Sequence, residues 1–263
     1  MVVKGLMRAI LAVACCLAAY VATAEPVQQK HFGDGIYYGG APVSKTPDDI
    51  QVLKNHDWYA VGYSKTHREA AWVAYSLGGK RHHAKVSKRP GNFRIDVRVG
   101  NPVPSSDYDG TGYDRGHMAA NQTMAEWHGH KAQYASFLMS NVVPQTPECN
   151  RGIWKRIEER ERGYPDTYGT IWVICGPVFS DHPDKLAGKS CDVPDAFFRI
   201  IVREDAQGPH AMALVVPQHP GSDKFEDFSV SVNSVESSTG LDVMSELPKE
   251  TQSSIEGAAT KPW

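Results

Sequence analysis

"YDRGHM", residues 113–118, places a carboxylate, a guanidinium, a glycine and an imidazole next to one another. Side chains so different in chemistry seldom adjoin for packing reasons, so the stretch indicates a functional site. It follows the segment "VGNPVPSSDYDGTGY" (99–113), in which proline, glycine and aspartate recur. Because these residues favour turns, we expect the stretch to lie on a loop.

The segments after this stretch alternate between helix and loop patterns. "MAEWHGHKAQYASFLM" (124–139) has apolar residues near helical spacing, which predicts one helix. "SNVVPQTPECN" (140–150) contains two prolines and is expected to be a loop. "RGIWKRIEERERGY" (151–164) is strongly amphipathic and predicts a second helix.

Short apolar runs with the composition of strands make up much of the remaining chain. They occupy residues 57–64, 69–78, 170–179, 195–202 and 210–218. "SVSVNSVESSTG" (229–240) begins as a strand and ends as a short helix capped by Gly240. Strands interrupted by helices of uneven length predict an α+β layered domain, in which a central, mainly antiparallel sheet is flanked by helices.

The first 24 residues have the pattern of a removable export signal. Lys4 and Arg8 give a positive start, an apolar run too short to span a bilayer follows, and "ATA" precedes Glu25. Cys15 and Cys16 raise a lipoprotein alternative, but neither has a leucine three residues upstream. We therefore expect a secreted or periplasmic protein with no stable membrane association.

Removal of residues 1–24 would leave about 239 residues, enough for one large domain with a substantial core. Residues 25–55 are polar and glycine-rich and are interpreted as an N-terminal extension. No linker divides residues 56–248, which are predicted to form the domain. The last segment, 249–263, is expected to be a poorly ordered tail.

The net charge of the chain is −2, so a protein that binds polyanions would need a local basic surface. Residues 79–98 offer one, with a single Asp96 among the basic residues Lys80, Arg81, Lys85, Lys88, Arg89, Arg94 and Arg98. A solvated loop has the same composition, so charge alone leaves both interpretations open. No aromatic platform is evident in the sequence, and a preference for single strands is therefore not predicted.

Cysteines remain at positions 149, 175 and 191 after the export signal. In an oxidising compartment one pair is expected. Cys175 with Cys191 would close a short loop and leave Cys149 as an odd thiol, although the sequence leaves the pairing open.

Several kinds of catalytic site are excluded because their motifs are missing. No G-x-S-x-G elbow is present, and the histidines at 82–83 and 128–130 lack partners at zinc-ligand spacing. Walker and Rossmann phosphate loops are absent as well. An imidazole beside a guanidinium suits a phosphate, because the cation binds its oxygens while neutral histidine takes a proton from water.

Hydrolysis of a phosphodiester usually also needs a hard divalent cation, whose preferred ligands are oxygens. Oxygen-bearing side chains lie downstream of the stretch at Asn141, Gln145, Asn150 and Glu158. Asn150 also lies at a predicted helix start, where backbone amides favour anions.

Three motifs together resemble a known family. "DRGH" (114–117), "FLMSNVVPQ" (137–145) and "NRGIWKRIEERER" (150–162) are similar to the DNA/RNA non-specific endonucleases of the ββα-metal superfamily, to which endonuclease G belongs. The likeness continues through "ICGPVF", "VPDAFF" and "VNSVESSTGL" and covers roughly residues 57 to 248. DRGH alone is a weak match, whereas the motifs in this order are a specific one.

The resemblance implies catalytic and metal-binding roles. His117 would be the general base that deprotonates the attacking water. Asn150 would be the only direct protein ligand of Mg²⁺, for which Mn²⁺ can substitute. Glu158 would hold metal-bound waters, and Asp114 would do the same or brace the turn.

The resemblance also implies residues that bind phosphate. Arg115 and Arg162 would bind phosphate and offset charge in the transition state, while Asn141 would orient the site loop. The family has a further arginine upstream of DRGH. Across "RPGNF" (89–93), Arg89 is the first choice for it and Arg94 the second.

These features predict an exported, Mg²⁺-dependent endonuclease that hydrolyses DNA and RNA with little sequence preference, because phosphate contacts carry no base information. A catalytically silent nucleic-acid-binding module and a phosphodiesterase for small phosphate esters stay open as alternatives. Asn150 could be only a helix N-cap, and Glu158 with Arg162 only an exposed i,i+4 pair, as Arg160 and Glu161 are expected to be. The oligomeric state is left open.

Overall fold

The structure, a computed structural model, describes residues 32–82, 89–188 and 190–263. The predicted export signal at 1–24 lies outside the described residues. So do Lys85 and Lys88 of the basic segment.

A seven-stranded sheet, with strand order β12-β11-β10-β9-β6-β5-β4, forms the centre of the unit His31–Trp263. Each pair of neighbours in this order is antiparallel. The strands are β4 (Ile50–Asn55), β5 (Tyr59–Ser64), β6 (Glu69–Leu77), β9 (Ile171–Val178), β10 (Ala196–Asp205), β11 (Gly208–Pro217) and β12 (Ser229–Val230). The strands predicted from short apolar runs are confirmed.

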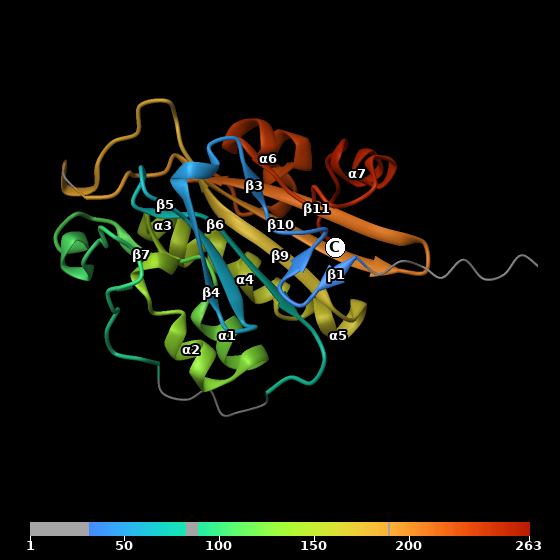
Figure 1. The fold of residues 1–263 in the computed structure, drawn as a ribbon, viewed down its shortest axis with the longest axis horizontal. Coiled ribbons are helices and arrows are strands. Elements are labelled where there is room, and N and C mark those ends of the chain that lie inside the picture. The colour runs from blue at the N-terminus through green and yellow to red at the C-terminus, as the bar shows by residue number, and fades with distance from the viewer. Residues whose placement is uncertain (1–31, 83–88, 189) are drawn as a thin grey trace, which may run out of the picture. The chain divides into compact units, whose positions relative to one another are not determined.

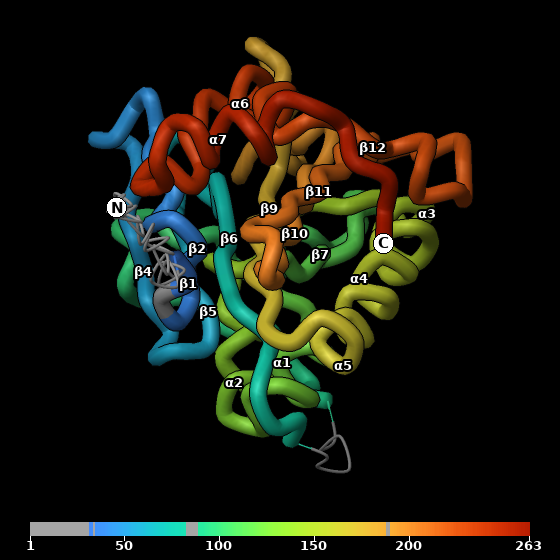
Figure 2. Tube along the Cα trace, turned by 90° about the vertical axis from the view of Figure 1, so that its right-hand side faces the viewer, coloured from blue at the N-terminus to red at the C-terminus, as the bar shows by residue number. Residues whose placement is uncertain are grey.

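The sheet is buried on both faces, as its nearly continuous apolar strands require. In β6 the side chains alternate: Val73 and Tyr75 belong to one core cluster, and Trp72 and Ala74 to the other. Figures 1 and 2 show the two covering layers, with α6 (Val232–Thr239) and α7 (Lys249–Glu256) on one side. On the other side are α1 (Asn121–His128), α2 (His130–Ala135) and α4 (Lys155–Glu161). The predicted α+β layered architecture is confirmed.

The remaining elements are short. They are the pairs β1 (Gly33–Asp34) with β2 (Tyr37–Tyr38) and β3 (Val43–Ser44) with β13 (Leu241–Asp242), and the helices α3 (Pro147–Cys149) and α5 (Tyr164–Tyr168). No helix among the described residues has both the length and the apolar character that a membrane crossing requires.

The DRGH stretch is a strand, so the expectation that it lies on a loop is wrong. It forms β7 (Asp114–His117), which pairs antiparallel with β8 (Val142–Gln145) from the segment expected to be a loop. Pro144 is tolerated because this sheet has only two strands, so every strand is an edge. At Gly116 a Cβ atom would come within 2.1 Å of the Gln145 side chain, which explains the glycine of the motif.

The helix predicted over 124–139 is divided. Gly129 has φ +83°, which ends α1 and begins α2, and α2 ends at Ala135. The helix predicted over 151–164 is present as α4, preceded by a π-helical turn at Asn150–Trp154. The strand and the short helix predicted within 229–240 are confirmed, and Gly240 adopts the left-handed C-cap conformation.

Both ends of the domain extend further than expected. β4 at Ile50–Asn55 is part of the main sheet, so a domain boundary at residue 56 is wrong. The tail expected to be poorly ordered forms α7 and then packs Trp263 against Tyr164, whose hydroxyl donates to the Trp263 carbonyl at 2.9 Å. An aromatic anchor after the last helix supplies the apolar contact that the polar tail lacks.

The cysteines of the described residues are free and buried, so the expected link between Cys175 and Cys191 is wrong. Cys175 belongs to the core cluster beneath the site, where its thiol contacts the Met118 carbonyl at 3.4 Å. Cys191 packs in a separate cluster beside Tyr108. Burial raises the pKa of the Cys149 and Cys175 thiols to about 12, which keeps both unreactive.

Candidate active site

A pocket of about 540 Å³ opens where β7 meets the segment 150–162. Five basic side chains and two carboxylates line it, so it suits an anion. The lining residues are Arg89, Arg115, His117, Ala120, Asn121, Gln122, Asn150, Arg151, Lys155, Glu158, Glu159 and Arg162. The structure thus brings together six of the eight predicted site residues, and Asp114 and Asn141 lie behind them.

Strand geometry explains how one short motif presents two functional side chains. Successive residues of a strand point to opposite faces, so Arg115 and His117 share a face of β7. Both line the pocket, whereas Asp114 points to the opposite face of the strand and is not in the lining. One face of this strand therefore presents both pocket-lining side chains of the motif.

His117 lies between two aromatic rings. Its ring centroid is 5.1 Å from that of Phe93 and 4.8 Å from that of Phe137. Burial, together with the positive charge of Arg89, lowers the pKa of His117 to about 3. Its Nε2 atom is buried and has no hydrogen-bond partner among the described residues. The imidazole is therefore neutral at pH 7 and holds an unused nitrogen.

Arg115 is held by the turn Ser105–Tyr108, which precedes β7. Its Nε donates to the Ser105 hydroxyl at 2.8 Å and its Nη2 to the Ser105 carbonyl at 2.7 Å. An ion pair with the exposed Asp109 adds a third restraint. These contacts fix the guanidinium before any ligand arrives, which lowers the entropy cost of binding.

Asn150 and Asp114 form a hydrogen-bonded pair at the pocket. The Asn150 Nδ2 donates to Asp114 Oδ2 at 2.9 Å, and Arg151 donates to both oxygens of Asp114 at 2.8 and 2.6 Å. Burial opposes the charge of Asp114, but the hydrogen bonds from Arg151 and Asn150 outweigh it and lower the pKa of Asp114. Because the carboxylate only accepts, the amide oxygen of Asn150 is left for another ligand.

Glu158 lies on α4 above a buried ion network. Burial raises the pKa of Glu158 to about 8, against the attraction of Arg199, whose Nη2 lies 3.7 Å from Glu158 Oε1. Arg199 also pairs with Glu161, and the Tyr75 hydroxyl donates to Glu161 at 2.8 Å. Arg199 and Glu161 are fully buried, so the interpretation of Glu161 as an exposed helix residue is wrong.

Arg162 is also anchored rather than exposed. Its Nη1 contacts the Glu158 carbonyl at 3.3 Å and its Nε lies 3.7 Å from Glu126 Oε1. Only 16 % of the Arg162 side chain is exposed. An exposed i,i+4 pair of Glu158 and Arg162 is therefore excluded, since both side chains are mostly buried and line the pocket.

The structure separates the two candidates for the upstream arginine. Arg89 lines the pocket and lies with its guanidinium carbon 5.4 Å from the Phe137 ring centroid. Arg94 lies instead 3.7 Å over Tyr134 and lines a different cavity. Arg89 therefore lines the pocket that contains His117, and Arg94 does not.

Asn141 is a brace behind the pocket. Its Oδ1 accepts from the Ala119 amide at 2.9 Å, and its Nδ2 donates to the carbonyls of Ala119 and Ser136 at 3.0 and 2.9 Å. Its own carbonyl accepts from Met118, the residue after His117. Asn141 is fully buried, so it fixes the backbone on the C-terminal side of His117 without reaching the pocket.

Sequence reasoning missed several members of the site. Arg151, Lys155 and Glu159 line the pocket, and Arg199 supports it from β10. The helical period could have pointed to Lys155 and Glu159, because residues three and four apart from Arg151 and Arg162 share their face. Nothing in the run "DAFFRIIV" (195–202) distinguishes Arg199 from a solvent-facing strand residue.

The donor set can be tested against a bound cation. Asn150 offers an amide oxygen and Glu158 a carboxylate, which are ligands of hard divalent ions. In the described part of the chain no three His, Cys, Asp or Glu residues come together as a metal cage. A cation held by one or two protein oxygens, with water and phosphate filling the other positions, fits this arrangement.

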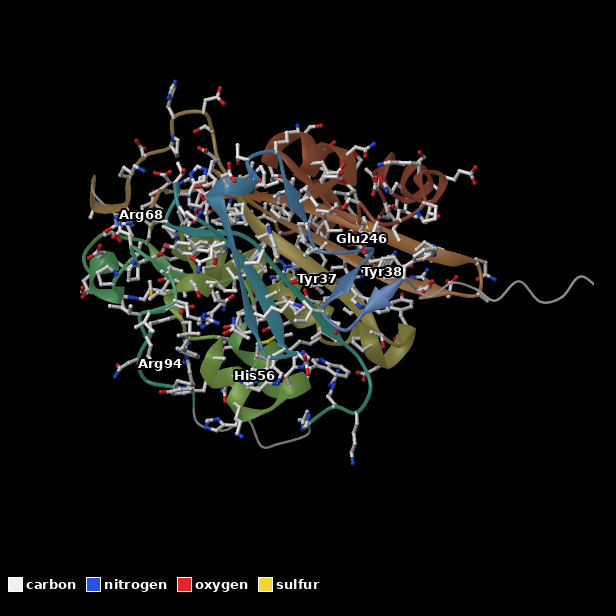
Figure 3. All side chains as sticks on the ribbon, viewed as in Figure 1. Tyr37, Tyr38, His56, Arg68, Arg94 and Glu246 are labelled. Atoms are coloured by element: carbon white, nitrogen blue, oxygen red, sulfur yellow. The ribbon has the colours of Figure 1, made fainter. Side chains whose placement is uncertain are left out.

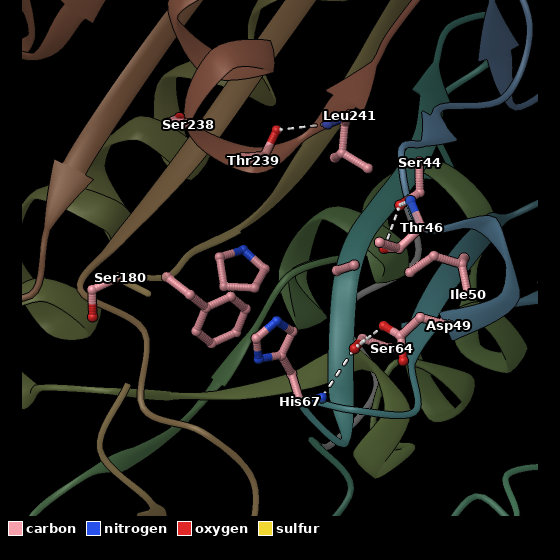
Figure 4. Close-up of a pocket in the computed structure, with 13 residues that line it drawn as sticks. Ser44, Thr46, Asp49, Ile50, Ser64, His67, Ser180, Ser238, Thr239 and Leu241 are labelled. Atoms are coloured by element: carbon pink, nitrogen blue, oxygen red, sulfur yellow. Dashed lines mark hydrogen bonds between the residues drawn. The ribbon is translucent and has the colours of Figure 1, made fainter. Parts of the chain in front are cut away.

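A second polar pocket contains a histidine in a different setting. It is lined by Ser64, Asp49 and His67, among others, and Figure 4 shows the Ser64–Asp49 contact beside His67. The His67 ring stacks on Phe179 at 3.9 Å, and its Nδ1 lies 2.7 Å from Asp192 Oδ2. This histidine has a partner for its nitrogen and a role in packing.

The antiparallel strand pair β7–β8, followed by α4, carries an imidazole on a strand and oxygen ligands on the helical segment. This order of elements places the protein in the ββα-metal class. Nucleases of this class use a divalent metal ion.

A sequence model of the DNA/RNA non-specific endonucleases matches residues 40–250, and the chain belongs to this family. It is 33% identical over 235 residues to a nuclease from Nostoc sp. (strain PCC 7120), which covers 83% of this chain and 81% of that protein. It is 31% identical over 207 residues to mitochondrial endonuclease G from Homo sapiens, covering 73% of this chain and 69% of that protein.

The fold is also similar to that of a solved structure. A chain in the crystal structure of the EndoG/EndoGI complex superposes with a TM-score of 0.68 at 28% identity. The superposition covers 82% of this chain and 92% of that chain. The family and the fold together identify a nucleic acid hydrolase.

Proposed function

We propose that this protein is a Mg²⁺-dependent endonuclease that hydrolyses phosphodiester bonds in both DNA and RNA with little sequence preference. One observation carries the proposal: a single pocket contains a neutral histidine, two oxygen ligands for a hard cation and five basic side chains. The family assignment supports the same reaction.

His117 acts as the general base. A base must be unprotonated before the reaction, and the pKa of about 3 keeps the imidazole neutral throughout the physiological range. The unpartnered Nε2 is the atom that accepts the proton from the attacking water, because no described group competes for it. Phe93 and Phe137 hold the ring in place, and Asn141 fixes the adjoining backbone.

The amide oxygen of Asn150 is the direct protein ligand of the cation, and Glu158 and Asp114 act on it through water. When bound, Mg²⁺ neutralises charge on the phosphate oxygens and stabilises the leaving oxygen. Mn²⁺ is expected to replace it because both prefer oxygen ligands. Glu158 must lose its proton to take this role, and a nearby divalent charge favours that loss.

Arg89, Arg115 and Arg162 bind the phosphate and offset its charge in the transition state. All three line the pocket, and Arg115 and Arg162 are held there by other contacts. Contacts to phosphate carry no information about the base, so cleavage should depend little on sequence. Binding should weaken steeply with salt, because each phosphate contact releases counterions.

Plasmid nicking by the full chain, with and without a chelator, tests this function. We expect the chelator to abolish cleavage, and Mg²⁺ or Mn²⁺ to restore it. Asn150→Ala should be inactive with its fold retained, whereas Asn233→Ala on the exposed surface of α6 should cleave like the parent. Restoration by Zn²⁺ alone would contradict the assigned ligands. Cleavage of a chromogenic diester but not of plasmid would indicate a small phosphate ester as substrate.

We also propose that the protein is exported to the periplasm or beyond the cell, with a mature chain that begins near Glu25. The proposal rests on the pattern of residues 1–24 alone. Mass spectrometry of protein recovered outside the cytoplasm should find this N-terminus. A lipid on Cys15 or Cys16 would contradict it.

A further inference from the structure

A second cavity, of about 500 Å³, lies beside α2 and has a composition unlike that of the active site. It is lined by Asn55, His56, Trp58, Arg94, His130, Lys131, Tyr134, Ala135 and Leu138. Figure 3 shows His56 and Arg94, two lining residues that are far apart in the sequence. Both lie near the helical layer of α1 and α2. Its volume is in the range of pockets that hold small organic groups.

Flat side chains form two walls of this cavity. His56 and Trp58 lie with ring centroids 4.5 Å apart, and the Arg94 guanidinium lies 3.7 Å over the Tyr134 ring. Tyr134 is 48% exposed, which is unusual for so large a ring. Exposed aromatic and guanidinium planes are the surfaces on which unpaired nucleobases stack.

An unused hydrogen-bond donor lies at the same cavity. Asn55 is only 6% exposed, and its Oδ1 accepts from Arg98 Nη2 at 3.0 Å. Its Nδ2 is buried and has no partner among the described residues. An unpaired buried donor carries a free-energy cost, which a carbonyl or ring nitrogen of a bound base would remove.

The charge of the cavity complements a polyanion. Arg94 and Lys131 are both in its lining, and no carboxylate residue is. Within the described residues neither of these two side chains forms an ion pair with a carboxylate. Arg94 donates one hydrogen bond to the Tyr134 carbonyl, but neither charge is neutralised by a carboxylate, so both can attract phosphates on either side of a base.

The cavity also adjoins the proposed active site. Tyr134 and Phe137 are one turn apart, since the Phe137 amide donates to the Tyr134 carbonyl at 3.3 Å. The Phe137 ring makes an edge contact with His117 and lies under Arg89. The Tyr134 ring lies under Arg94. Two arginine–aromatic pairs thus follow one another from the catalytic histidine to the cavity.

From this juxtaposition we propose that the cavity between Trp58 and Tyr134 binds an unpaired nucleobase of the nucleic-acid substrate, next to the cleaved phosphate. The proposal rests on the proposed function and adds a substrate class, single-stranded or locally unpaired DNA and RNA. The base stacks on the Tyr134 and Trp58 walls, Asn55 Nδ2 donates to it, and Arg94 and Lys131 bind the flanking phosphates. Binding of the base remains independent of sequence, because every base has a face that can stack.

Binding to two oligomers with equal numbers of phosphates tests the pocket. The full chain, in chelator so that nothing is cut, is titrated into oligothymidylate and into the matching oligomer of abasic residues, with fluorescence anisotropy as readout. The parent should bind oligothymidylate about tenfold more tightly, the size expected for one stacked base. Tyr134→Ala should remove this preference and leave binding to the abasic oligomer unchanged, while Tyr134→Phe should retain it.

Phe225→Ala is the matched control, because Phe225 also lies under arginines but outside this cavity. It should keep the preference for bases. Equal binding of both oligomers by the parent, or a loss on both oligomers in Tyr134→Ala, would overturn the proposal. Plasmid nicking by the same parent preparation separates the two claims. Nicking without base preference refutes the pocket alone, and base preference without nicking refutes the proposed function while the pocket stands.

Discussion

His117 and His67 both lie in polar pockets and pack against aromatic rings, yet their hydrogen-bond partners and nearby charges differ. His67 has Asp192 on its Nδ1 at 2.7 Å and stacks on Phe179, and its amide donates to the Ser64 hydroxyl while its carbonyl accepts from the Asp192 amide. His117 has no partner for its buried Nε2, and its nearby charge is the cation of Arg89 rather than a carboxylate.

The difference sets a histidine paired with a carboxylate through one nitrogen apart from a histidine whose buried nitrogen has no partner among the described residues. A paired nitrogen contributes to stability but is not free to take a proton. An unpaired buried nitrogen costs stability and persists where the site uses it. Replacement of His117 should therefore lower the cleavage rate, and replacement of His67 should lower the stability of the fold.

His117→Ala should show the largest effect. Removal of a positioned base costs on the order of 10²–10⁴ in rate. Affinity for nucleic acid should persist, since Arg89, Arg115 and Arg162 supply the phosphate contacts. Single-turnover cleavage, binding and melting should be measured on one preparation. Cleavage at the parent rate would refute the mechanism, and a joint loss of melting temperature and affinity would make His117 structural.

Arg89→Ala tests whether the positive charge of the guanidinium beside His117 contributes to catalysis. We expect a loss of about 10²-fold in kcat/KM on DNA and RNA alike, as for loss of one group that stabilises transition-state charge. Arg160→Ala is the matched control, because Arg160 lies over Phe225 and lines neither the active-site pocket nor the second cavity. It should cleave duplex DNA almost as the parent does. A severe Arg94→Ala with a mild Arg89→Ala would reverse the assignment of the two arginines.

His67→Ala should give the opposite result, a loss of stability with activity retained. The Asp192 side chain is only 4% exposed and would keep Lys185 but lose its bond to the imidazole. Leaving a buried carboxylate partly unpaired costs about 1–3 kcal/mol. Chemical denaturation measures this change, and plasmid nicking under native conditions checks activity. If His67→Ala melts like the parent but loses cleavage, the structural interpretation of this pocket is wrong.

The smallest expected effect is a dependence of stability on pH that comes from His117. Its folded-state pKa of about 3 lies below the ordinary value of about 6.5, so between these values only the unfolded chain binds the proton. Stability should therefore fall as pH drops below about 6.5 and be unaffected by this group above it.

At about pH 5.5 the contribution is on the order of 1 kcal/mol, and His117→Ala should remove it. Denaturation curves of the parent and of His117→Ala at neutral pH and at about pH 5.5 measure the difference. Because the other histidines are present in both proteins, their contributions cancel and only His117 contributes to the difference. An equal loss of stability in both would show that His117 is protonated normally in the folded protein. The same low pKa means that an activity rise near pH 6.5 would come from a group other than His117.

Local patterns were sufficient to predict most elements and most of the site. The apolar strands at 171–178 and 196–205, the amphipathic α4 and the Gly240 cap follow from composition and period, which act over a few residues. The resemblance to the endonuclease family implied the roles of His117, Asn150 and Glu158, and the structure places all three at one pocket.

Other features depended on contacts between distant segments. DRGH is a strand only because residues 142–145 pair with it, and Trp263 packs against Tyr164 and Tyr168 from an earlier helix. Arg199, Glu161 and Tyr75 look like ordinary strand and helix residues until packing buries them together beneath Glu158. The three thiols stay apart because the core places them in separate surroundings.

The sequence by itself determined which chemical groups this protein has and the local elements that carry them, since both are properties of neighbouring residues. Only the tertiary structure decided which histidine has an unpaired buried nitrogen, which arginine lines the pocket beside it, and that Asn55, Trp58, Arg94 and Tyr134 meet in one cavity. The physical reason is that burial, pKa and hydrogen-bond satisfaction depend on all the groups packed around an atom, and these come from segments far apart in the chain.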